Sequence, residues 1–411
     1  MLDRVSKVLT LNACDHCLGR QFSQLLSGYT NAERGHALRT ALALAIDSGL
    51  KFEGINPGNF AGFTFRTNKD FEKVEKKAGK CEICNGLFAE GMDKLASRAA
   101  KQLGKLDIGN FLVGTQLSQD LLDREEKLWQ NVGIDFAEPL RAELNREVGK
   151  KIEKLSGKHA EFKRPDVAVL LDLKTGKVNL TIHPLFIAGY YRKLKRGFPQ
   201  SKWGTPLHYK TSIEEEIGKP LLKLTKGKDT KFHGAGREDI DARCLDWRAF
   251  VIEVEKPNCR RIDFRKMEKM VARGGKVSVS KLKVSDMNTV RRIKEATPDK
   301  TYRAVVRLKK DVKPGELPKL QQLICTISQR TPERVLHRRA DLSRRREVKS
   351  LKCKRIGPKK LELIVSGSSG LYIKELVSGD KGRTKPSVAE LLGVEAKVSE
   401  LDVIRIGKIV L

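Results

Sequence analysis

The sequence predicts an α+β protein that is divided into two or three domains, and three observations lead to this prediction. At 411 residues the chain is too long for one ordinary hydrophobic core. A hydrophobic fraction of 39% is enough for globular packing. In the C-terminal half, apolar strand patterns such as residues 250–255 and 302–308 follow one another without regular crossover helices, which argues against a doubly wound sheet.

The N-terminal segment contains two Cys-x-x-Cys turns, at residues 14–17 and 81–84. Where thiols are kept reduced, two such turns converge most economically on one tetrahedral zinc ion, and the chain between them forms a small module. A single Cys-x-x-Cys turn could instead be a redox pair. His16 is interpreted as a neighbour of the site. The predicted ligands of a closed, structural site are Cys14, Cys17, Cys81 and Cys84.

The middle of the chain, residues 86–163, is predicted to form helices broken by short strands. Residues 117–129 and 140–155 place apolar side chains at helical intervals. Residues 167–173 then have the pattern of a buried strand, and a glycine-containing turn leads to a second strand at 178–182. These two strands are predicted to form a β-hairpin.

Residues 183–203 interleave aromatic side chains with five basic residues. Because aromatic rings stack on unpaired bases and basic side chains bind phosphates, this strip is a candidate RNA contact. The alternative is a domain junction that packs its aromatic rings inward. The basic run at residues 330–360 has two interpretations as well, a phosphate-binding loop or a solvated charged face.

Charge indicates the class of partner. The chain has 82 Lys and Arg residues against 51 Asp and Glu, which gives a formal net charge of +31. The charge is spread along the whole chain, which favours nucleic acid over a membrane, because membranes are more often met by a local basic amphipathic helix. No apolar run approaches the roughly 20 residues of a bilayer span, and no signal peptide is evident. We therefore expect a cytoplasmic protein that binds no membrane.

The turn at residues 234–243 is the best candidate for chemistry. It places Asp239 and Asp241 among arginines, behind Gly234 and Gly236. A carboxylate surrounded by cations stays ionised at neutral pH, and at the end of a tight turn it can act as a nucleophile or a base. The alternative is an exposed charged turn without a catalytic role.

Motifs from the C-terminal half resemble those of one enzyme family. They are the Gly-Arg-x-Asp motif at 236–239, the Lys-x-Tyr motif at 300–302, and residues 361–376. With the paired Cys-x-x-Cys turns and residues 329–342, they make nearly the whole chain resemble the archaeal and eukaryotic tRNA pseudouridine synthases that modify uridines 54 and 55 of the TΨC loop. The resemblance implies a mixed, largely antiparallel catalytic sheet flanked by helices, and an N-terminal zinc-containing, THUMP-like RNA-binding domain. It divides the chain into residues 1–85, 86–200 and 201–411.

The family implies a role for each matching residue. Asp239 would be the catalytic carboxylate of a reaction that breaks the uracil glycosidic bond, turns the base and rejoins it through carbon. Whether it attacks the sugar or acts as a base is left open. Arg237 would fill the stack vacated by the flipped uridine, and Tyr302 would stack on the target base. Lys374 would pair with Asp239 and hold it ionised, and Tyr372 is a further predicted substrate contact.

Secondary roles follow for the neighbours of these residues. Asp241 and Arg243 are expected to brace the turn, although Asp241 is the rival candidate for the reactive carboxylate. Leu363 and Ile373 are expected to be apolar walls of the pocket.

Other functions compete with this interpretation. The chain has no Walker-type loop, and no third glycine follows Gly234 and Gly236 at dinucleotide-fold spacing, so no nucleotide cofactor is expected. The predicted partners are tRNA and a structural zinc ion, with no cofactor for catalysis; the oligomeric state is not predicted. The alternatives are a non-catalytic zinc-containing tRNA-binding protein and another tRNA-modifying enzyme with a THUMP-like domain, such as a methyltransferase.

Overall fold

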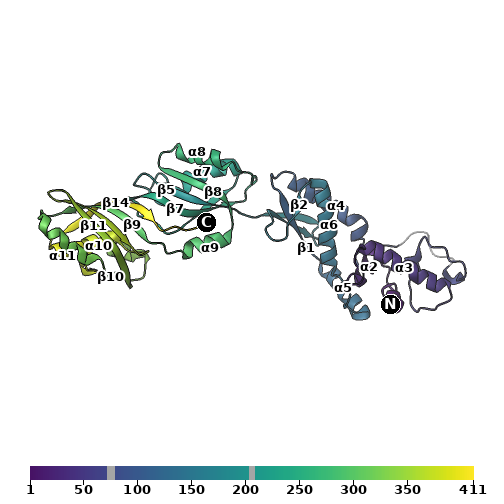
Figure 1. Ribbon diagram of the computed structural model, residues 1–411. Helices are drawn as coiled ribbons and strands as arrows, with labels where there is room; N and C mark the ends of the chain where they lie inside the picture. Colours follow the sequence, from purple (N-terminus) through teal and green to yellow (C-terminus); the bar gives the residue numbers. More distant parts are fainter. Residues whose placement is uncertain (72–78, 203–208) are drawn as a thin grey trace. The chain divides into compact units, whose positions relative to one another are not determined.

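The computed structural model describes residues 1–71, 79–202 and 209–411, which form two compact units, Met1–His183 and Pro184–Leu411 (Figure 1). Among the described helices, none combines the length and the apolar character needed to cross a membrane. Trp203, the end of the candidate RNA strip, lies outside the described residues. The three-part division stays a prediction; residues 184–200 belong to the second unit.

The first part of unit 1 is helical around the two Cys-x-x-Cys turns. Its helices are α1 (Leu2–Val8), α2 (Asp15–Gly19), η1 (Arg20–Phe22), α3 (Asn31–Asp47), η2 (Pro57–Phe60), η3 (Lys69–Phe71) and η4 (Leu87–Gly91). α3 begins at a capping box, in which the side chains of Thr30 and Glu33 each bond the other's backbone N–H. Buried apolar residues from α1, α2 and α3 belong to the same core as those of the following sheet.

The rest of unit 1 is a small sheet covered by helices. The strands β1 (Asn110–Gln116), β2 (His159–Ala160), β3 (Val167–Asp172) and β4 (Lys177–Ile182) lie in the order β2-β1-β3-β4. α4 (Met92–Leu103), α5 (Gln119–Val132) and α6 (Leu140–Ser156) complete the unit. The predicted helices at 117–129 and 140–155 and the predicted antiparallel hairpin are therefore confirmed.

Unit 2 is built on one mixed sheet. The strand order is β13-β10-β11-β12-β9-β14-β7-β5-β8, and β6 also pairs with β7. Of the strand pairs that the structure describes in unit 2, β7 with β14 is parallel and the others are antiparallel, as the resemblance implies. The strands are β5 (Leu185–Lys193), β6 (Asp229–Gly234), β7 (Ala242–Glu255), β8 (Val277–Ser285), β9 (Lys300–Leu308), β10 (Thr326–Arg330), β11 (Ser343–Gly357), β12 (Lys360–Gly367), β13 (Thr384–Lys385) and β14 (Ala396–Ile406).

Helices flank this sheet in two groups (Figure 1). α7 (Ile213–Thr225) and α8 (Phe264–Ala272) pack with β5, β7 and β8, and α9 (Met287–Glu295) packs on the opposite face, against β6 and β7. η5 (Pro314–Leu323), α10 (Ile373–Ser378) and α11 (Val388–Leu392) share a second core with β9, β12 and β14. η6 (Glu333–Arg338) follows β10, and η7 (Asp380–Gly382) follows α10. β14 lies between β7 and β9 in this sheet: its residues 401–403 pair with the start of β7 at 242–244 and with residues 302–304 of β9.

Candidate active site

The Gly-Arg-x-Asp motif lies in the turn between β6 and β7. Gly236 has a φ of 79°, in the left-handed region that favours glycine, and a Cβ added there would lie 3.1 Å from Arg248 Nη1. A Cβ at Gly234 would lie 2.6 Å from Gln200 Nε2. Glycine at both positions therefore lets the turn lie directly against polar side chains of the interior.

Buried side chains support this turn from below. Glu238 points inward, 3.3 Å from Arg248 Nε, and both side chains are 1% exposed. Tyr191 donates its hydroxyl to the same carboxylate at 2.9 Å, and burial raises the pKa of this tyrosine well above its usual value. Lys193 donates to the backbone carbonyl of Asp239 at 3.1 Å and to that of the next residue at 2.8 Å. We call Glu238, Tyr191, Arg248 and Lys193 the buried support.

Asp239 points the other way, between two cations. Arg334 reaches Oδ1 with Nη1 at 3.3 Å and Oδ2 with Nη2 at 3.2 Å, and Lys374 Nζ lies 3.2 Å from Oδ2. Burial acts to raise the pKa of Asp239, but the charges of Arg334 and Lys374 outweigh it and hold the pKa below its usual value. Asp239 is therefore an ionised carboxylate at neutral pH.

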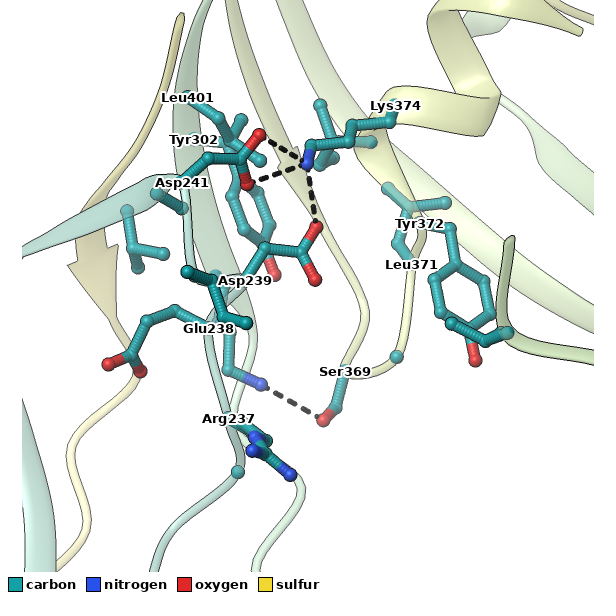
Figure 2. A pocket seen from close by; sticks show the side chains of 18 of the residues that line it. Arg237, Glu238, Asp239, Asp241, Tyr302, Ser369, Leu371, Tyr372, Lys374 and Leu401 are labelled. Atoms are coloured by element: carbon teal, nitrogen blue, oxygen red, sulfur yellow. Dashed lines mark hydrogen bonds and ion pairs between the residues drawn. The ribbon is translucent and has the colours of Figure 1, made fainter. Parts of the chain in front are cut away.

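Each of these two cations also contacts a second carboxylate, at a shorter distance than Asp239. Lys374 Nζ bonds the two oxygens of Asp241 at 2.7 and 2.8 Å, and Figure 2 shows it between Asp239 and Asp241. Arg334 Nε donates to Glu375 at 2.7 Å. The shorter contacts belong to Asp241 and Glu375, so Asp239 receives only the longer ones. Asp239, Asp241, Arg334 and Lys374 are called the exposed cluster below; the side chain of Glu375 is buried beneath it.

A pocket of about 450 Å³ opens over Asp239. The turn, β9 and the segment leading into α10 bring all five predicted catalytic and substrate residues to its lining: Arg237, Asp239, Tyr302, Tyr372 and Lys374. These residues belong to three separate parts of the sequence. The structure therefore brings the three motifs into one site, as the resemblance predicts.

The apolar walls agree with the prediction at one position and differ at the other. Ile373 lines the pocket, whereas Leu363 is fully buried in the core and was predicted wrongly. Side chains alternate along β12, and Leu363 lies on the face that packs into this core. The other apolar lining residues include Leu371, Leu401 and Val403.

Two side chains of β9 face the pocket. Burial raises the pKa of Tyr302 to about 12, so its phenol is protonated at neutral pH. Lys300 lies two residues earlier on the same strand; burial, with the nearby charge of Arg248, lowers its pKa to about 8. Its Nζ donates to Ser369 Oγ at 3.1 Å. The sequence singled out Lys300 as part of a motif only, without a role.

Tyr372 is held by its backbone. Its N–H donates to Gln329 Oε1 at 2.9 Å, and its carbonyl accepts from Gln329 Nε2 at 3.0 Å. Its hydroxyl accepts from Arg339 at 2.8 Å. Gln329 and Arg339 both belong to the run 329–342 that carries part of the resemblance, so this run contributes directly to the pocket.

Arg334 and Glu375 are two residues beside Asp239 that sequence reasoning missed. Arg334 was included in the run 329–342, but it is one of many basic residues there, and nothing in the pattern separates it from solvated neighbours. Glu375 follows Lys374 directly and matched no role. The expected bracing role of Arg243 agrees with its contacts, because it donates to both oxygens of the buried Asp402 at 2.8 Å.

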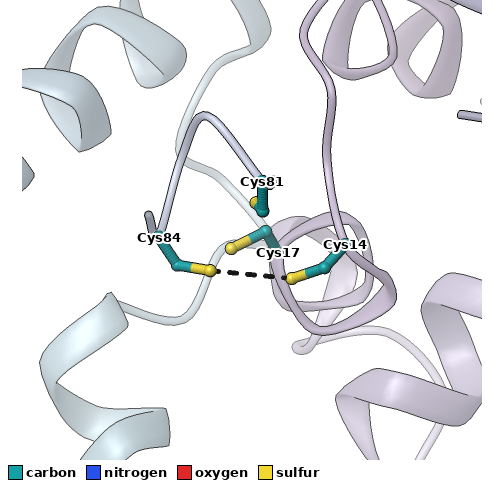
Figure 3. A group of neighbouring side chains, drawn as sticks. All are labelled: Cys14, Cys17, Cys81 and Cys84. Atoms are coloured by element: carbon teal, nitrogen blue, oxygen red, sulfur yellow. Dashed lines mark hydrogen bonds between the residues drawn. The ribbon is translucent and has the colours of Figure 1, made fainter. Parts of the chain in front are cut away.

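The four predicted metal ligands also lie together, in unit 1 (Figure 3). Their sulfur atoms all lie within 4.8 Å of one another, and Cys14 and Cys84 are 3.8 Å apart. A tetrahedron with zinc–sulfur bonds of about 2.3 Å has edges of about 3.8 Å, so this cluster fits a zinc ion. His16 is not a member; its Nδ1 lies 2.8 Å from Glu143 Oε1, and its ring stacks on Phe88.

Comparisons with known proteins agree with these features. Residues 186–407 match the family model "Pus10, C-terminal", and residues 95–172 match "Pus10 THUMP domain, archaeal". A "tRNA pseudouridine synthase Pus10" from Methanothrix thermoacetophila is 40% identical over 96% of this chain and 91% of its own length. One from Thermofilum pendens is 37% identical over 98% of this chain and 95% of its own. The THUMP domain implied by the resemblance is therefore confirmed.

Among solved structures, the chain is similar to one in a Cbf5-Nop10-Gar1 complex. The identity is 18%, and the match covers 53% of this chain and 48% of the other, with a TM-score of 0.31.

Proposed function

The chain belongs to the Pus10 family, whose matched relatives are named tRNA pseudouridine synthases, and from this premise we propose that it isomerises uridine to pseudouridine at positions 54 and 55 of tRNA. One observation carries the proposal: Asp239 is an ionised carboxylate that faces a pocket from a rigidly supported turn. The substrate is the TΨC loop, and the reaction needs no cofactor. Because tRNA is the substrate, we also propose a cytoplasmic location.

The pocket supplies what such a reaction requires. The glycosidic bond of a stacked base is out of reach, so the uridine must leave the stack before the chemistry begins. Arg237 is an exposed cation on the pocket lining that takes the place of the flipped base, since a guanidinium is planar and stacks well. Tyr302 and Tyr372 provide aromatic faces for the base, and Leu371 and Val403 exclude water.

Asp239 acts at the sugar of the flipped uridine. The bond between C1′ and N1 of uracil breaks, the base turns, and a bond forms between C1′ and C5. A base then removes the proton on C5, and N1, which kept the electron pair of the broken bond, gains a proton. An ionised carboxylate beside C1′ serves this sequence either as a nucleophile or as a base. Lys374 keeps Asp239 ionised, and Asp241 holds Lys374 in place.

The test is to incubate the purified protein with an unmodified tRNA transcript and to map carbodiimide-resistant uridines by primer extension. We expect new pseudouridine at positions 54 and 55. Pseudouridine elsewhere would correct the proposed positions, and none at all would contradict the activity. The alternative, a non-catalytic tRNA-binding protein, predicts that Asp239→Asn leaves every function intact.

We also propose that Cys14, Cys17, Cys81 and Cys84 hold a structural zinc ion. Four thiolates complete the coordination shell, so the metal supplies folding energy to unit 1 and takes no part in the reaction. Elemental analysis of the purified protein is expected to give one zinc per chain. Cys84→Ser is expected to release the ion and to lower the melting temperature. The proposal would be contradicted if the purified wild-type protein contained no zinc, or if removing its metal with a chelator left its melting temperature unchanged.

A further inference from the structure

Arg334 lies between two carboxylates and contacts both of them. Its two terminal nitrogens reach the two oxygens of Asp239 at 3.3 and 3.2 Å, and its Nε donates to Glu375 Oε1 at 2.7 Å. The Glu375 side chain is 5% exposed, and its second oxygen is buried without a hydrogen-bond partner. Glu375 is thus a buried carboxylate that forms an ion pair with Arg334, and the same guanidinium contacts Asp239.

The segment that carries Arg334 is anchored on both sides. Before η6, the carbonyl of Thr331 accepts two hydrogen bonds from Arg383, at 3.1 and 2.8 Å, and the Thr331 hydroxyl donates to the carbonyl of Ala340 at 2.7 Å. Within η6, the N–H of Glu333 donates to Asp380 at 3.1 Å. Because the backbone is held at these points, the guanidinium of Arg334 approaches Asp239 from a fixed direction.

The contacts at Asp239 distinguish its two oxygens. Oδ2 lies 3.2 Å from a nitrogen of Arg334 and 3.2 Å from that of Lys374, whereas among the described residues Oδ1 has one contact, to Arg334 Nη1 at 3.3 Å. Charge-assisted hydrogen bonds between nitrogen and oxygen usually measure about 2.7–2.9 Å, so all three of these contacts are long. A sugar atom that approaches Oδ1 replaces one long contact, whereas at Oδ2 it would have to replace two. The contacts of Arg334 with Glu375 and with Oδ2 can persist meanwhile.

We propose that Arg334 is a positioning residue of the isomerisation: anchored by Glu375, it keeps Asp239 ionised and oriented through Oδ2 and leaves Oδ1 to meet the sugar of the flipped uridine. This inference rests on the proposed function. It adds a second cation to the role that the resemblance gives to Lys374 alone, and it assigns Glu375 as the residue that orients this cation.

The charged and titratable groups around Asp239 determine how far its pKa changes when Arg334 loses its charge. They are Arg334 from η6 and Arg339 just after it, Lys374 and Glu375 from α10 and Tyr372 just before it, Arg237 and Asp241 from the same turn, Lys193 from β5, Arg248 from β7, and Lys300 and Tyr302 from β9. Removing the charge of Arg334 leaves Lys374 as the one cation in direct contact with the carboxylate among the described residues. The pKa of Asp239 then rises, and the ionised form is lost at a higher pH as the solution is acidified.

The experiment measures turnover of unmodified tRNA transcript as a function of pH for Arg334→Gln. We expect kcat to fall about 10- to 100-fold, KM to change less than about 3-fold, and the acid limb of the pH–rate profile to move to higher pH. Arg334→Lys retains the positive charge but not the planar guanidinium that contacts both carboxylates at once. It is therefore expected to restore the position of the acid limb and part of kcat.

Two further variants separate positioning from support of η6. Lys381→Gln removes an exposed ion pair between Lys381 of η7 and Glu333, which lies in η6 next to Arg334. This change does not touch Asp239, so it is expected to leave kcat and the pH profile unchanged. Glu375→Gln removes the anchor but also a negative charge, so it is expected to lower kcat without moving the acid limb upward. If Arg334→Gln lowers the melting temperature, the rescue by Arg334→Lys still decides between the two roles.

The outcomes also separate this inference from the proposed function. If the wild-type protein makes no pseudouridine, the function itself is wrong. If the wild type is active and Arg334→Gln keeps the wild-type kcat and acid limb, the inference alone is overturned. A lower kcat with an unmoved acid limb, not restored by Arg334→Lys, would show that Arg334 merely supports the fold, which also overturns it.

Discussion

The neighbouring carboxylates of Glu238 and Asp239 lie in opposite environments on the two sides of the β6–β7 turn. Below the turn, Glu238 is almost fully buried against Arg248 and Tyr191. Above it, Asp239 is 30% exposed and shares two cations whose shorter contacts go elsewhere. The buried support fixes the backbone, and the exposed cluster leaves one carboxylate charged but incompletely bonded. The position of the turn and the reactivity of Asp239 therefore depend on separate sets of residues, so mutations can disturb them separately.

The largest effect is expected for Asp239→Asn. The change removes the reactive charge and keeps the shape, so we expect pseudouridine formation to fall by at least about 10³-fold while tRNA binding changes little. Single-turnover kinetics and a gel-shift titration of the same tRNA measure the two quantities. A matching loss of binding would mean that the exposed cluster also serves recognition.

The buried support is tested by Arg248→Met. This change leaves Glu238 as a buried charge without its cation, and breaking a buried pair in this way costs about 3–5 kcal/mol. We expect the free energy of unfolding, measured with denaturant, to fall by that amount. The double change with Glu238→Leu is expected to recover part of the loss, since it removes the uncompensated charge. An unchanged stability would contradict the division of labour between the two sides.

Lys374→Gln is expected to have an intermediate effect on the opposite side. Asp239 keeps Arg334, so activity falls about 10- to 100-fold, and Asp239 loses a cation that lowers its pKa. Turnover should therefore decline at a higher pH than in the wild type as the solution is acidified. Folding stability should change by less than about 1 kcal/mol, because the pair is partly exposed. A large loss of folding stability would show that Lys374, like the residues of the buried support, holds the fold in place.

The smallest effect is expected for Asp241→Asn. The Asp241 side chain is 66% exposed, and an amide still offers an oxygen to Lys374. We expect activity within about 5-fold of the wild type in the same single-turnover assay. A loss as large as that of Asp239→Asn would reverse the assignment of the reactive carboxylate.

Much of this arrangement could be predicted from sequence, because local patterns carry it. The β3–β4 hairpin, helices α5 and α6, and the cysteine cluster each follow from apolar periodicity or from ligand spacing. The five pocket residues were predicted through a family resemblance, since nothing in their spacing shows that β9 and α10 meet the turn.

Other features could not be predicted in this way. Arg334 was missed because its role depends on where η6 packs, and its neighbours in the sequence are equally basic. Leu363 was misplaced because the face of β12 that forms the core depends on the pairing of the whole sheet. The inward direction of Glu238 likewise depends on Arg248 and Tyr191, which come from β7 and β5.

The most direct test of the central claim compares Asp239→Asn and Asp241→Asn in one single-turnover assay on unmodified tRNA, with pseudouridine mapped at positions 54 and 55. The contacts predict that the Asp239 variant forms product at least about 100-fold more slowly than the Asp241 variant, with similar tRNA affinity. Equal rates for the two variants, or a slower Asp241 variant, would contradict the assignment of Asp239 as the reactive group.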